Sequence, residues 1–175
     1  MIPIRYQDAS YDDVPESIKV LLREMKQNNK GLYIHGTVGT GKTHIAYAIK
    51  KQYEKVMGRT ATFWSTTELF AEMKADFDRH RLDKQHTLDN LMESTRLLIL
   101  DDIGAEKPTE WVQEQFYLLI NKRYNEMHPT IFTSNLSISE LSAQLGDRIA
   151  SRIVEMCNIV RLDGTDRRLQ KKGTS

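Results

Sequence analysis

The sequence Gly36-Thr37-Val38-Gly39-Thr40-Gly41-Lys42-Thr43 lies one residue beyond the apolar run Leu32-Tyr33-Ile34. It fits the pattern G-x-x-x-x-G-K-[ST], in which a glycine-rich turn between a strand and a helix directs backbone N–H groups at a triphosphate. Lys42 can then reach the β- and γ-phosphates, and the Thr43 hydroxyl can ligate Mg²⁺. The whole stretch is therefore predicted to bind a nucleotide. The alternative is a glycine-rich turn without a ligand, and the flanking strand and helix patterns argue against it.

Short apolar or β-branched runs recur along the chain and predict the strands of a sheet. Residues 96–102 read Arg-Leu-Leu-Ile-Leu-Asp-Asp, which suits a strand buried on both faces of a parallel sheet. Because helical patterns separate the strands, we expect an α/β fold, a three-layer sandwich with helices on both faces of a five-stranded parallel sheet. The predicted strands are 32–34, 60–64, 96–102, 130–133 and 158–162.

Apolar residues at helical spacing predict the helices between these strands. The first fifteen or so residues, with two prolines and scattered Asp, instead predict an extended lead-in. Residues 1–30 combine this lead-in with a first helix, and we expect them to pack on a core of residues 31–175 within a single domain. Pro108 is expected to start one helix and Ser139 to cap another. The predicted helices are 17–28, 42–56, 67–81, 88–92, 111–125 and 147–156, with a short helix after Ser139.

Composition argues against several other classes of protein. The chain has no run of about 18 apolar residues and no signal-peptide pattern, so we expect a soluble, cytoplasmic protein without a membrane partner. Its one cysteine, Cys157, cannot form an internal disulfide. The five histidines show no zinc spacing, so no metal other than Mg²⁺ is expected. Because the net charge is only +1, any nucleic acid must be bound by a local patch or by an oligomer.

Asp101 and Asp102 end the apolar run that begins at Leu97. In a phosphate-loop enzyme, the first acid at such a strand end positions Mg²⁺ opposite the Thr43 hydroxyl. The second acid can accept a proton from the attacking water or orient that water. Two adjacent acids can also be a solvated strand end. The upstream phosphate loop favours a metal ligand at Asp101 and a catalytic group at Asp102.

Asn135 ends the fourth predicted strand, in Thr133-Ser134-Asn135. In a parallel sheet this strand end is expected beside the ends of the first and third strands, near the γ-phosphate. A neutral amide there can hydrogen-bond both phosphate and water without adding charge. The alternative is a turn-forming Asn before a loop, and the residues alone do not decide between the two.

Arg148 and Arg152 lie four residues apart and share one face of the last predicted helix. Arginine binds phosphate oxygens in pairs and can stabilise the charge that develops in phosphoryl transfer. The alternative is a solvated face on which the two arginines pair with neighbouring acids. Arg167 and Arg168 near the C-terminus leave the same two interpretations open.

The motifs occur in the order phosphate loop, Leu-Leu-Ile-Leu-Asp-Asp-Ile-Gly, Thr-Ser-Asn, Arg-Ile-Ala-Ser-Arg and Gly-Thr-Asp-Arg-Arg. This set resembles the AAA+ core of the bacterial helicase loaders, the DnaC/DnaI family, and of the related IstB transposition ATPases. The opening Ile2-Pro3-Ile4-Arg5-Tyr6 also resembles that family's lead-in. The resemblance spans nearly the whole chain and implies a phosphate-loop NTPase of the AAA+ class, with ATP and Mg²⁺ as its cofactors.

The resemblance also implies a role for each motif. The phosphate loop would be Walker A, Asp101 the Walker B magnesium ligand, Asp102 its catalytic partner and Asn135 sensor 1. Each of these residues would act within its own subunit.

The arginines would complete the site. Arg152 would be the arginine finger inserted into a neighbouring subunit's site, with Arg148 supporting it. Arg168, or otherwise Arg167, would be the sensor 2 arginine that touches the γ-phosphate in its own subunit. Self-association through the ATP site, as a ring or spiral, would then be required for full activity.

Three further features of the family bear on this chain. The family's separate helicase-gripping N-terminal segment has no counterpart in these 175 residues, and only about a dozen residues follow Leu162, which implies a reduced or absent helical lid. The predicted helix 67–81, with Arg79, His80 and Arg81, occupies the place of a helical insertion that can contact single-stranded DNA. Interspersed acids favour a solvated mixed-charge face for this helix instead.

The resemblance implies an ATPase that assembles on single-stranded DNA and loads or remodels a replicative DNA helicase in DNA replication. A second function on the same fold is an IstB-like ATPase that guides a transposase. A third, from another class, is a small-molecule kinase, which the paired acids, Asn135 and the arginine helix argue against. A GTP switch would carry Asn-Lys-x-Asp, and the nearest string here is Asn121-Lys122-Arg123-Tyr124. ATP is therefore the expected nucleotide.

Overall fold

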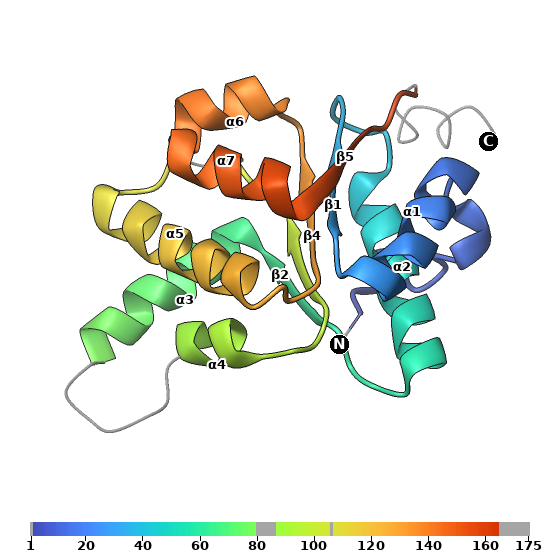
Figure 1. Cartoon of the computed structure of the whole chain (residues 1–175), viewed down its shortest axis with the longest axis horizontal. Helices are drawn as coiled ribbons and strands as arrows, with labels where there is room; N and C mark the ends of the chain where they lie inside the picture. Colours follow the sequence, from blue (N-terminus) through green and yellow to red (C-terminus); the bar gives the residue numbers. More distant parts are fainter. Residues whose placement is uncertain (1, 80–86, 106, 165–175) are drawn as a thin grey trace.

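The computed structural model describes residues 2–79, 87–105 and 107–164, and these form a five-stranded parallel sheet flanked by helices (Figure 1). The strand order is β2-β3-β4-β1-β5, so the first, third and fourth strands are neighbours. The predicted α/β class and the five parallel strands are thus confirmed. The strands are β1 (Gly31–His35), β2 (Thr62–Ser65), β3 (Leu98–Asp101), β4 (Thr130–Ser134) and β5 (Cys157–Arg161).

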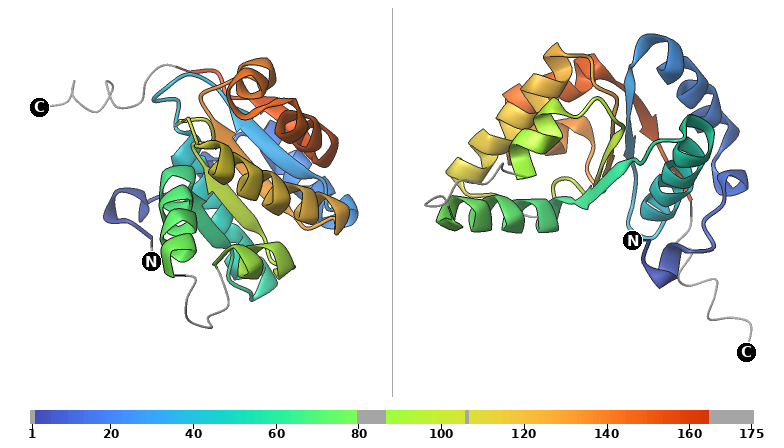
Figure 2. Two further views of the ribbon diagram at one scale, coloured as in Figure 1. Left: turned by 90° about the vertical axis from the view of Figure 1, so that its left-hand side faces the viewer. Right: turned by 90° about the horizontal axis from the view of Figure 1, so that it is seen from below.

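Helices cover both faces of the sheet (Figures 1 and 2). The first two helices and the lead-in lie on one face, and the later helices lie on the other. This arrangement gives the three layers that the alternation of strands and helices predicts. The helices are α1 (Glu16–Asn28), α2 (Lys42–Met57), α3 (Thr66–Arg79), α4 (Thr87–Glu93), α5 (Glu110–Asn125), α6 (Ile138–Leu145) and α7 (Asp147–Met156).

Two apolar cores lie against the two faces of the sheet. Successive side chains of a strand point to opposite faces, so Leu98 and Leu100 of β3 join the core under α5, whereas Ile99 joins the core under α2. All three side chains are almost completely buried. Burial on both faces explains why this strand reads as a continuous apolar run rather than as an alternating one. The sheet edge at the strand ends is left for polar side chains.

The lead-in differs from the prediction because it is not extended throughout. It forms two short 3₁₀ helices, η1 (Ile4–Tyr6) and η2 (Tyr11–Asp13), and the Ser10 side chain caps the second. Ala9 and Val14 beside these turns are buried in the core shared with α2. Short polar residues support local turns by bonding nearby backbone groups, which a reading of hydrophobic periodicity does not detect.

Two predicted helix starts are also displaced. Ser137, and not Ser139, caps α6, because its hydroxyl accepts from the Glu140 N–H while the Glu140 carboxylate accepts from the Ser137 N–H. This reciprocal pair is a capping box, and Ser-x-x-Glu is its sequence signature. Thr109, one residue after Pro108, caps α5. The positions of the remaining helices and strands agree with the prediction to within two residues or so.

Arg123 of α5 is fully buried, with 1% of its surface exposed, although no carboxylate among the described residues pairs with it. Its guanidinium donates to the Thr130 hydroxyl and to four backbone carbonyls, those of Leu91, Ser94, Arg96 and Pro129. Burial lowers the pKa of this side chain to about 10. The five hydrogen bonds tie α5 to the segments that lead into β3 and β4.

We expect Arg123→Met to lower the free energy of unfolding by about 3–5 kcal/mol, because it leaves buried carbonyls without donors. Arg96→Met is the matched control, since Arg96 is exposed and its side chain donates to the Thr60 hydroxyl; we expect a change within about 0.5 kcal/mol. Urea unfolding of both variants checks this. Equal stabilities would contradict a structural role for Arg123.

The longest described helices, α2 and α5, have 16 residues each and carry several charges. Within residues 2–79, 87–105 and 107–164, no helix is long and apolar enough to cross a bilayer. The expected reduction of the helical lid concerns residues beyond Gly164, which lie outside the described part of the chain. The same holds for His80 and Arg81 of the candidate DNA-contacting helix.

Candidate active site

The candidate site lies at the carboxyl ends of β1, β3 and β4, which are adjacent strands of the sheet. The phosphate loop connects β1 to α2, Asp101 ends β3 and Asp102 follows it, and Asn135 follows β4. In open parallel sheets, ligands bind beyond the carboxyl ends of the strands. The topology therefore brings together three motifs that lie far apart in the sequence.

The glycines of the loop are required by its backbone. Gly41 adopts a φ of 96° immediately before α2, a left-handed conformation that side chains disfavour. Gly36 passes so close to the segment after β5 that a Cβ atom there would lie 2.2 Å from the Leu162 carbonyl oxygen. The Leu162 N–H donates to the carbonyl of His35, over 2.7 Å. The loop is thus held by a backbone contact with the segment after β5.

Lys42, the first residue of α2, is folded back over the loop and is only 7% exposed. Its Nζ donates to the carbonyls of Gly36 at 2.7 Å and Thr37 at 2.8 Å. These bonds keep a positive charge at the mouth of a loop whose N–H groups begin a helix, where an anion is favoured. The geometry is that of a cradle for phosphate groups.

We expect Lys42→Ala to abolish ATP binding, because the ammonium supplies charged hydrogen bonds that are worth about 1.5–3 kcal/mol each. Titration with a fluorescent ATP analogue measures the affinity. Lys55→Ala is the matched control, since Lys55 is an exposed lysine in the last turn of the same helix. If ATP binding survived in the Lys42 variant, the phosphate-loop interpretation would be wrong.

Asp101 lies buried between two hydroxyl groups, with 6% of its surface exposed. Thr43 Oγ1 donates to one carboxylate oxygen at 2.9 Å, and Thr133 Oγ1 donates to the other at 2.6 Å. Burial raises the pKa of this carboxyl above its ordinary value, while the two hydroxyl donors lower it. The hydrogen bond between Thr43 and Asp101 joins the two residues that were predicted to bind Mg²⁺.

Asp102 has a left-handed backbone conformation, with a φ of 59°. This conformation is uncommon for residues other than glycine, and it turns the chain sharply where β3 ends. The Asp102 N–H donates to Thr133 Oγ1 at 2.9 Å, and Asp102 Oδ1 accepts from Asn135 Nδ2 at 3.0 Å. The structure therefore brings Asp101, Asp102 and Asn135 into one hydrogen-bonded group, as the strand order predicts.

Thr133 and Thr66 are members of this group that the sequence prediction missed. Thr133 is 1% exposed and bonds both acids, and Thr66, which is 3% exposed, donates to the Asp101 carbonyl at 2.9 Å. A signal was present for Thr133, because a hydroxyl in a strand buried on both faces must find a partner. Thr66 lies at the start of α3 and carries no comparable signal.

These residues fit a nucleotide with Mg²⁺. The loop supplies backbone N–H groups and an ammonium, and Thr43 and Asp101 supply oxygen ligands of the kind that Mg²⁺ prefers. Mg²⁺ usually keeps several waters and phosphate oxygens, so two protein ligands are sufficient. Within the described residues, no cluster of three or more His, Cys, Asp or Glu side chains forms another metal site.

A model of the protein family described as "IstB-like ATP binding protein" matches residues 15–175. The chain belongs to this family. The IstB-like chain is also 33% identical, over 153 residues, to the replicative helicase loader DnaI of Bacillus subtilis (strain 168). That alignment covers 79% of this chain and 48% of DnaI. The chain thus spans about half the length of this curated relative.

Solved structures of two helicase loaders resemble the IstB-like chain. The crystal structure of the DnaC helicase loader matches with a TM-score of 0.81 and 28% identity, covering 92% of this chain and 100% of the solved one. The crystal structure of DnaI matches with a TM-score of 0.76 and 26% identity, covering 95% of this chain and 94% of the solved one. The expected phosphate-loop fold of the AAA+ class is confirmed by these matches.

The arginines of the IstB-like chain lie apart from the phosphate loop. Arg148 and Arg152 are on α7, which packs on α5 over the face of the sheet opposite α2 (Figure 1). The Arg148 guanidinium lies 5.4 Å from the centre of the Tyr117 ring, and Arg152 forms an ion pair with Glu155. Within the described part of the chain, neither forms a hydrogen bond or an ion pair with the loop of its own subunit. Arg167 and Arg168 lie outside the described residues.

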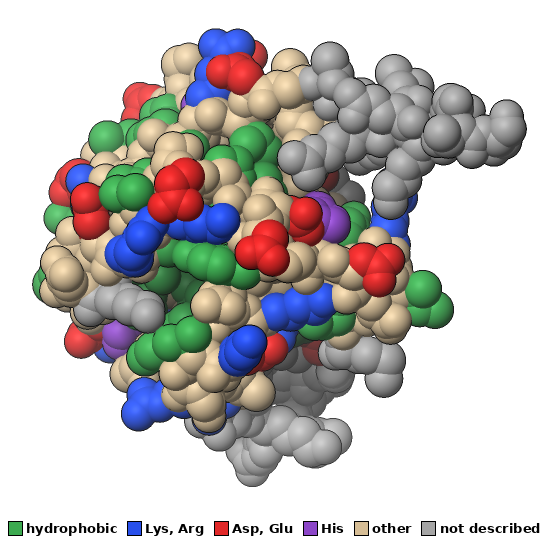
Figure 3. All heavy atoms as spheres, turned by 90° about the vertical axis from the view of Figure 1, so that its right-hand side faces the viewer, with side chains coloured by type: hydrophobic (Ala, Val, Ile, Leu, Met, Phe, Trp, Pro, Cys, Tyr) green, Lys and Arg blue, Asp and Glu red, His purple; other side chains and the backbone are tan. Residues whose placement is uncertain are grey.

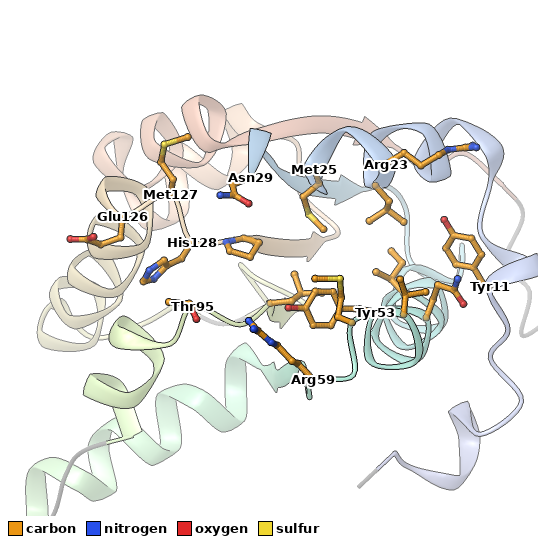
Figure 4. A pocket seen from close by; sticks show the side chains of 17 residues that line it. Tyr11, Arg23, Met25, Asn29, Tyr53, Arg59, Thr95, Glu126, Met127 and His128 are labelled. Carbon is orange, nitrogen blue, oxygen red and sulfur yellow. The ribbon is translucent and has the colours of Figure 1, made fainter. Parts of the chain in front are cut away.

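A separate cavity of about 500 Å³ lies between α1 and α2. It reaches from Tyr11 and Arg23 at one end to Glu126, Met127 and His128 at the other (Figure 4). Its lining includes residues that directly precede β3 and β4, so the cavity opens at the amino ends of the strands, away from the phosphate loop. It therefore does not contribute to the candidate active site.

The surface beside this cavity carries both signs of charge. On the face shown in Figure 3, basic side chains are interspersed with acidic ones. Arg23 pairs with Glu16 on α1, and Lys50 pairs with Glu54 on α2. Such intermingled charge is not the basic stripe that follows a nucleic-acid backbone. We therefore do not assign DNA contacts to this face.

Proposed function

We propose that this chain is an ATPase that assembles through its ATP site and loads or remodels a replicative DNA helicase on single-stranded DNA. The observation that carries the ATPase part is the hydrogen-bonded group of Thr43, Asp101, Thr133, Asp102 and Asn135 beside the phosphate loop. When bound, Mg²⁺ would neutralise the phosphates and the charge that develops on them.

Each residue of the group has a distinct role in this proposal. Thr43 and Asp101 hold the metal ion and Lys42 holds the phosphates. Asp102 orients the attacking water and accepts its proton, since its second carboxylate oxygen accepts no hydrogen bond from the described residues. Asn135 fixes the other oxygen of Asp102 and faces the same strand ends. The arrangement supports hydrolysis of ATP rather than transfer of phosphate to a bound small molecule.

The helicase part of the proposal is supported by the relatives. DnaI and DnaC are both described as helicase loaders, and the match to the solved DnaC structure covers that whole chain. Loading would place the protein in the cytoplasm, with the helicase, single-stranded DNA and further copies of itself as partners. ATP would hold the assembly together, and hydrolysis would release it.

A second candidate function is favoured by the family match itself. The matching model is that of the IstB-like proteins, and it covers residues 15–175. An ATPase of this kind would assemble on duplex DNA and regulate a transposase. The catalytic group is the same in both proposals, so the partner and the form of DNA distinguish them.

Two measurements test the proposal. The ATPase rate per subunit should rise with protein concentration, and single-stranded DNA should raise it further under the helicase-loader proposal, whereas duplex DNA should do so under the transposase proposal. A pull-down against a replicative helicase and against a transposase then separates the two partners. Binding to neither partner would overturn both assignments, and stoichiometric phosphorylation of a small molecule would instead support a kinase.

A further inference from the structure

Arg152 lies against α5 through two contacts that fix its guanidinium. Its Nε donates to Asn121 Oδ1 at 3.1 Å, and its guanidinium carbon lies 4.6 Å from the centre of the Tyr124 ring. The hydrogen bond fixes the side chain about its long axis, and the ring supports the guanidinium plane. Arginine is otherwise a long side chain with many rotamers, so two such contacts strongly restrict it.

The phosphate-binding edge of Arg152 is left largely open by these contacts. Within the described part of the chain, no hydrogen bond engages its Nη2. Nη1 has one acceptor, Glu155 Oε1, at the long distance of 3.4 Å. The side chain remains 32% exposed. Of the two terminal nitrogens that could bind a phosphate, one thus has no hydrogen bond within the described residues and the other has a single long one.

Glu155 could close onto Arg152 and block this edge, but other donors hold it. The Tyr124 hydroxyl donates to Glu155 Oε2 at 2.6 Å, and the Ser151 hydroxyl donates to Oε1 at 3.2 Å. The carboxylate therefore keeps hydrogen-bond partners when Arg152 turns toward a phosphate. Tyr124 serves twice, because its ring supports the arginine and its hydroxyl restrains the competing acid.

Arg148 on the same face of α7 lacks such support. Its guanidinium lies 5.4 Å from the Tyr117 ring centre, and it forms no hydrogen bond or ion pair with the other described residues. Asn121 and Tyr124 lie close to one helical turn apart on α5, so both reach the Arg152 position of α7. The structure thus distinguishes between two arginines that the sequence presents as equivalent.

We propose that Asn121 and Tyr124 are positioning residues, which hold the Arg152 guanidinium ready to enter the ATP site of a neighbouring copy of this chain. The inference rests on the proposed shared ATP site. In this arrangement, α5 of one subunit positions the arginine that completes the ATP site of the next subunit. An arginine held in place loses less conformational entropy when it binds the γ-phosphate. A larger part of the interaction energy is therefore available to lower the barrier to ATP hydrolysis.

Mixed subunits test this proposal. Lys42→Ala supplies an intact Arg152 but binds no ATP, and Arg152→Ala binds ATP but supplies no finger. Each variant alone should be inactive, and a mixture of the two, at high protein concentration with single-stranded DNA, should regain part of the wild-type turnover. Asn121→Ala or Tyr124→Leu is then placed in one partner at a time.

Placed in the Lys42→Ala partner, either change should lower the regained kcat about tenfold or more, with the KM for ATP unchanged. Placed in the Arg152→Ala partner, the same change should have no effect, because that subunit contributes only its ATP site. Tyr124→Phe keeps the ring and should lower the rate less than Tyr124→Leu. A purely structural role would lower the rate equally from either partner.

The outcomes separate the two proposals. If the mixture regains no activity, the shared site is refuted, and the positioning role falls with it. If the mixture regains activity that Asn121→Ala and Tyr124→Leu leave unchanged in the Lys42→Ala partner, the shared site stands and the positioning role is refuted. Equal losses from both partners would also refute it.

Discussion

Asp102→Asn is expected to lower ATP turnover by about 10²–10⁴-fold while ATP binding stays intact. The amide has nearly the same shape as the carboxylate, and its oxygen can still accept from Asn135 Nδ2, which lies 3.0 Å from Asp102 Oδ1. It cannot accept a proton from water. Because Lys42, Thr43 and Asp101 are unchanged, the groups proposed to hold the nucleotide remain in place.

Phosphate release and binding of a fluorescent ATP analogue, measured on the same preparation, check both halves of this expectation. Asp89→Asn is the matched control, since Asp89 is an exposed acid on α4, away from the phosphate loop in the sequence. The Asp102→Asn variant should also form stable ATP-bound assemblies, because hydrolysis no longer disperses them. Turnover near that of the wild type would show that Asp102 is a solvated strand end, as the sequence alone allows.

Arg152→Ala should lower turnover by about 10³-fold or more if the side chain is a finger that acts on a neighbour's ATP. The affinity for ATP should change little, because Arg152, among the described residues, forms no hydrogen bond with the phosphate loop of its own subunit. ATPase rates across a range of protein concentrations measure the effect. The wild-type rate per subunit should rise with concentration, whereas the rate of the variant should stay flat.

Arg148→Ala is the informative comparison for Arg152→Ala. Both changes remove a guanidinium from the same face of α7, and both remove a contact with a tyrosine ring of α5. Only Arg152 also has its Nε hydrogen-bonded. We expect the Arg148 variant to lose much less activity. Unchanged turnover in the Arg152 variant would refute the shared site, and the reverse order of effects would make Arg148 the finger.

The phosphate loop and the acidic strand end could be predicted because their signals are local. The spacing of Gly36, Gly41 and Lys42 encodes a turn between a strand and a helix, and the apolar run before Asp101 encodes a buried strand. The rule that carboxyl ends of parallel strands share one edge then places Asn135 beside the acids, where the structure has it.

Side-chain partners across the fold could not be predicted in the same way. Thr133 donates to Asp101, which lies 32 residues away in the chain, and Arg123 finds its carbonyl acceptors in three different segments. A threonine in a strand or an arginine in a helix looks ordinary in the sequence. The Ser137 cap is different, since its Ser-x-x-Glu signature is present in the sequence, although the cap was expected at Ser139.

The sequence alone was sufficient to predict the class of fold, the order of its elements, the glycine-rich loop between β1 and α2 and the two acids at the end of β3. Those features follow from periodicity and from short motifs, which depend on neighbouring residues alone. The tertiary structure was needed to show that Asp101 is held between two hydroxyl groups, and that Asn121 of α5 bonds Arg152 of α7 rather than Arg148. These depend on packing between distant segments, where a few tenths of an ångström decide whether a polar group finds its partner.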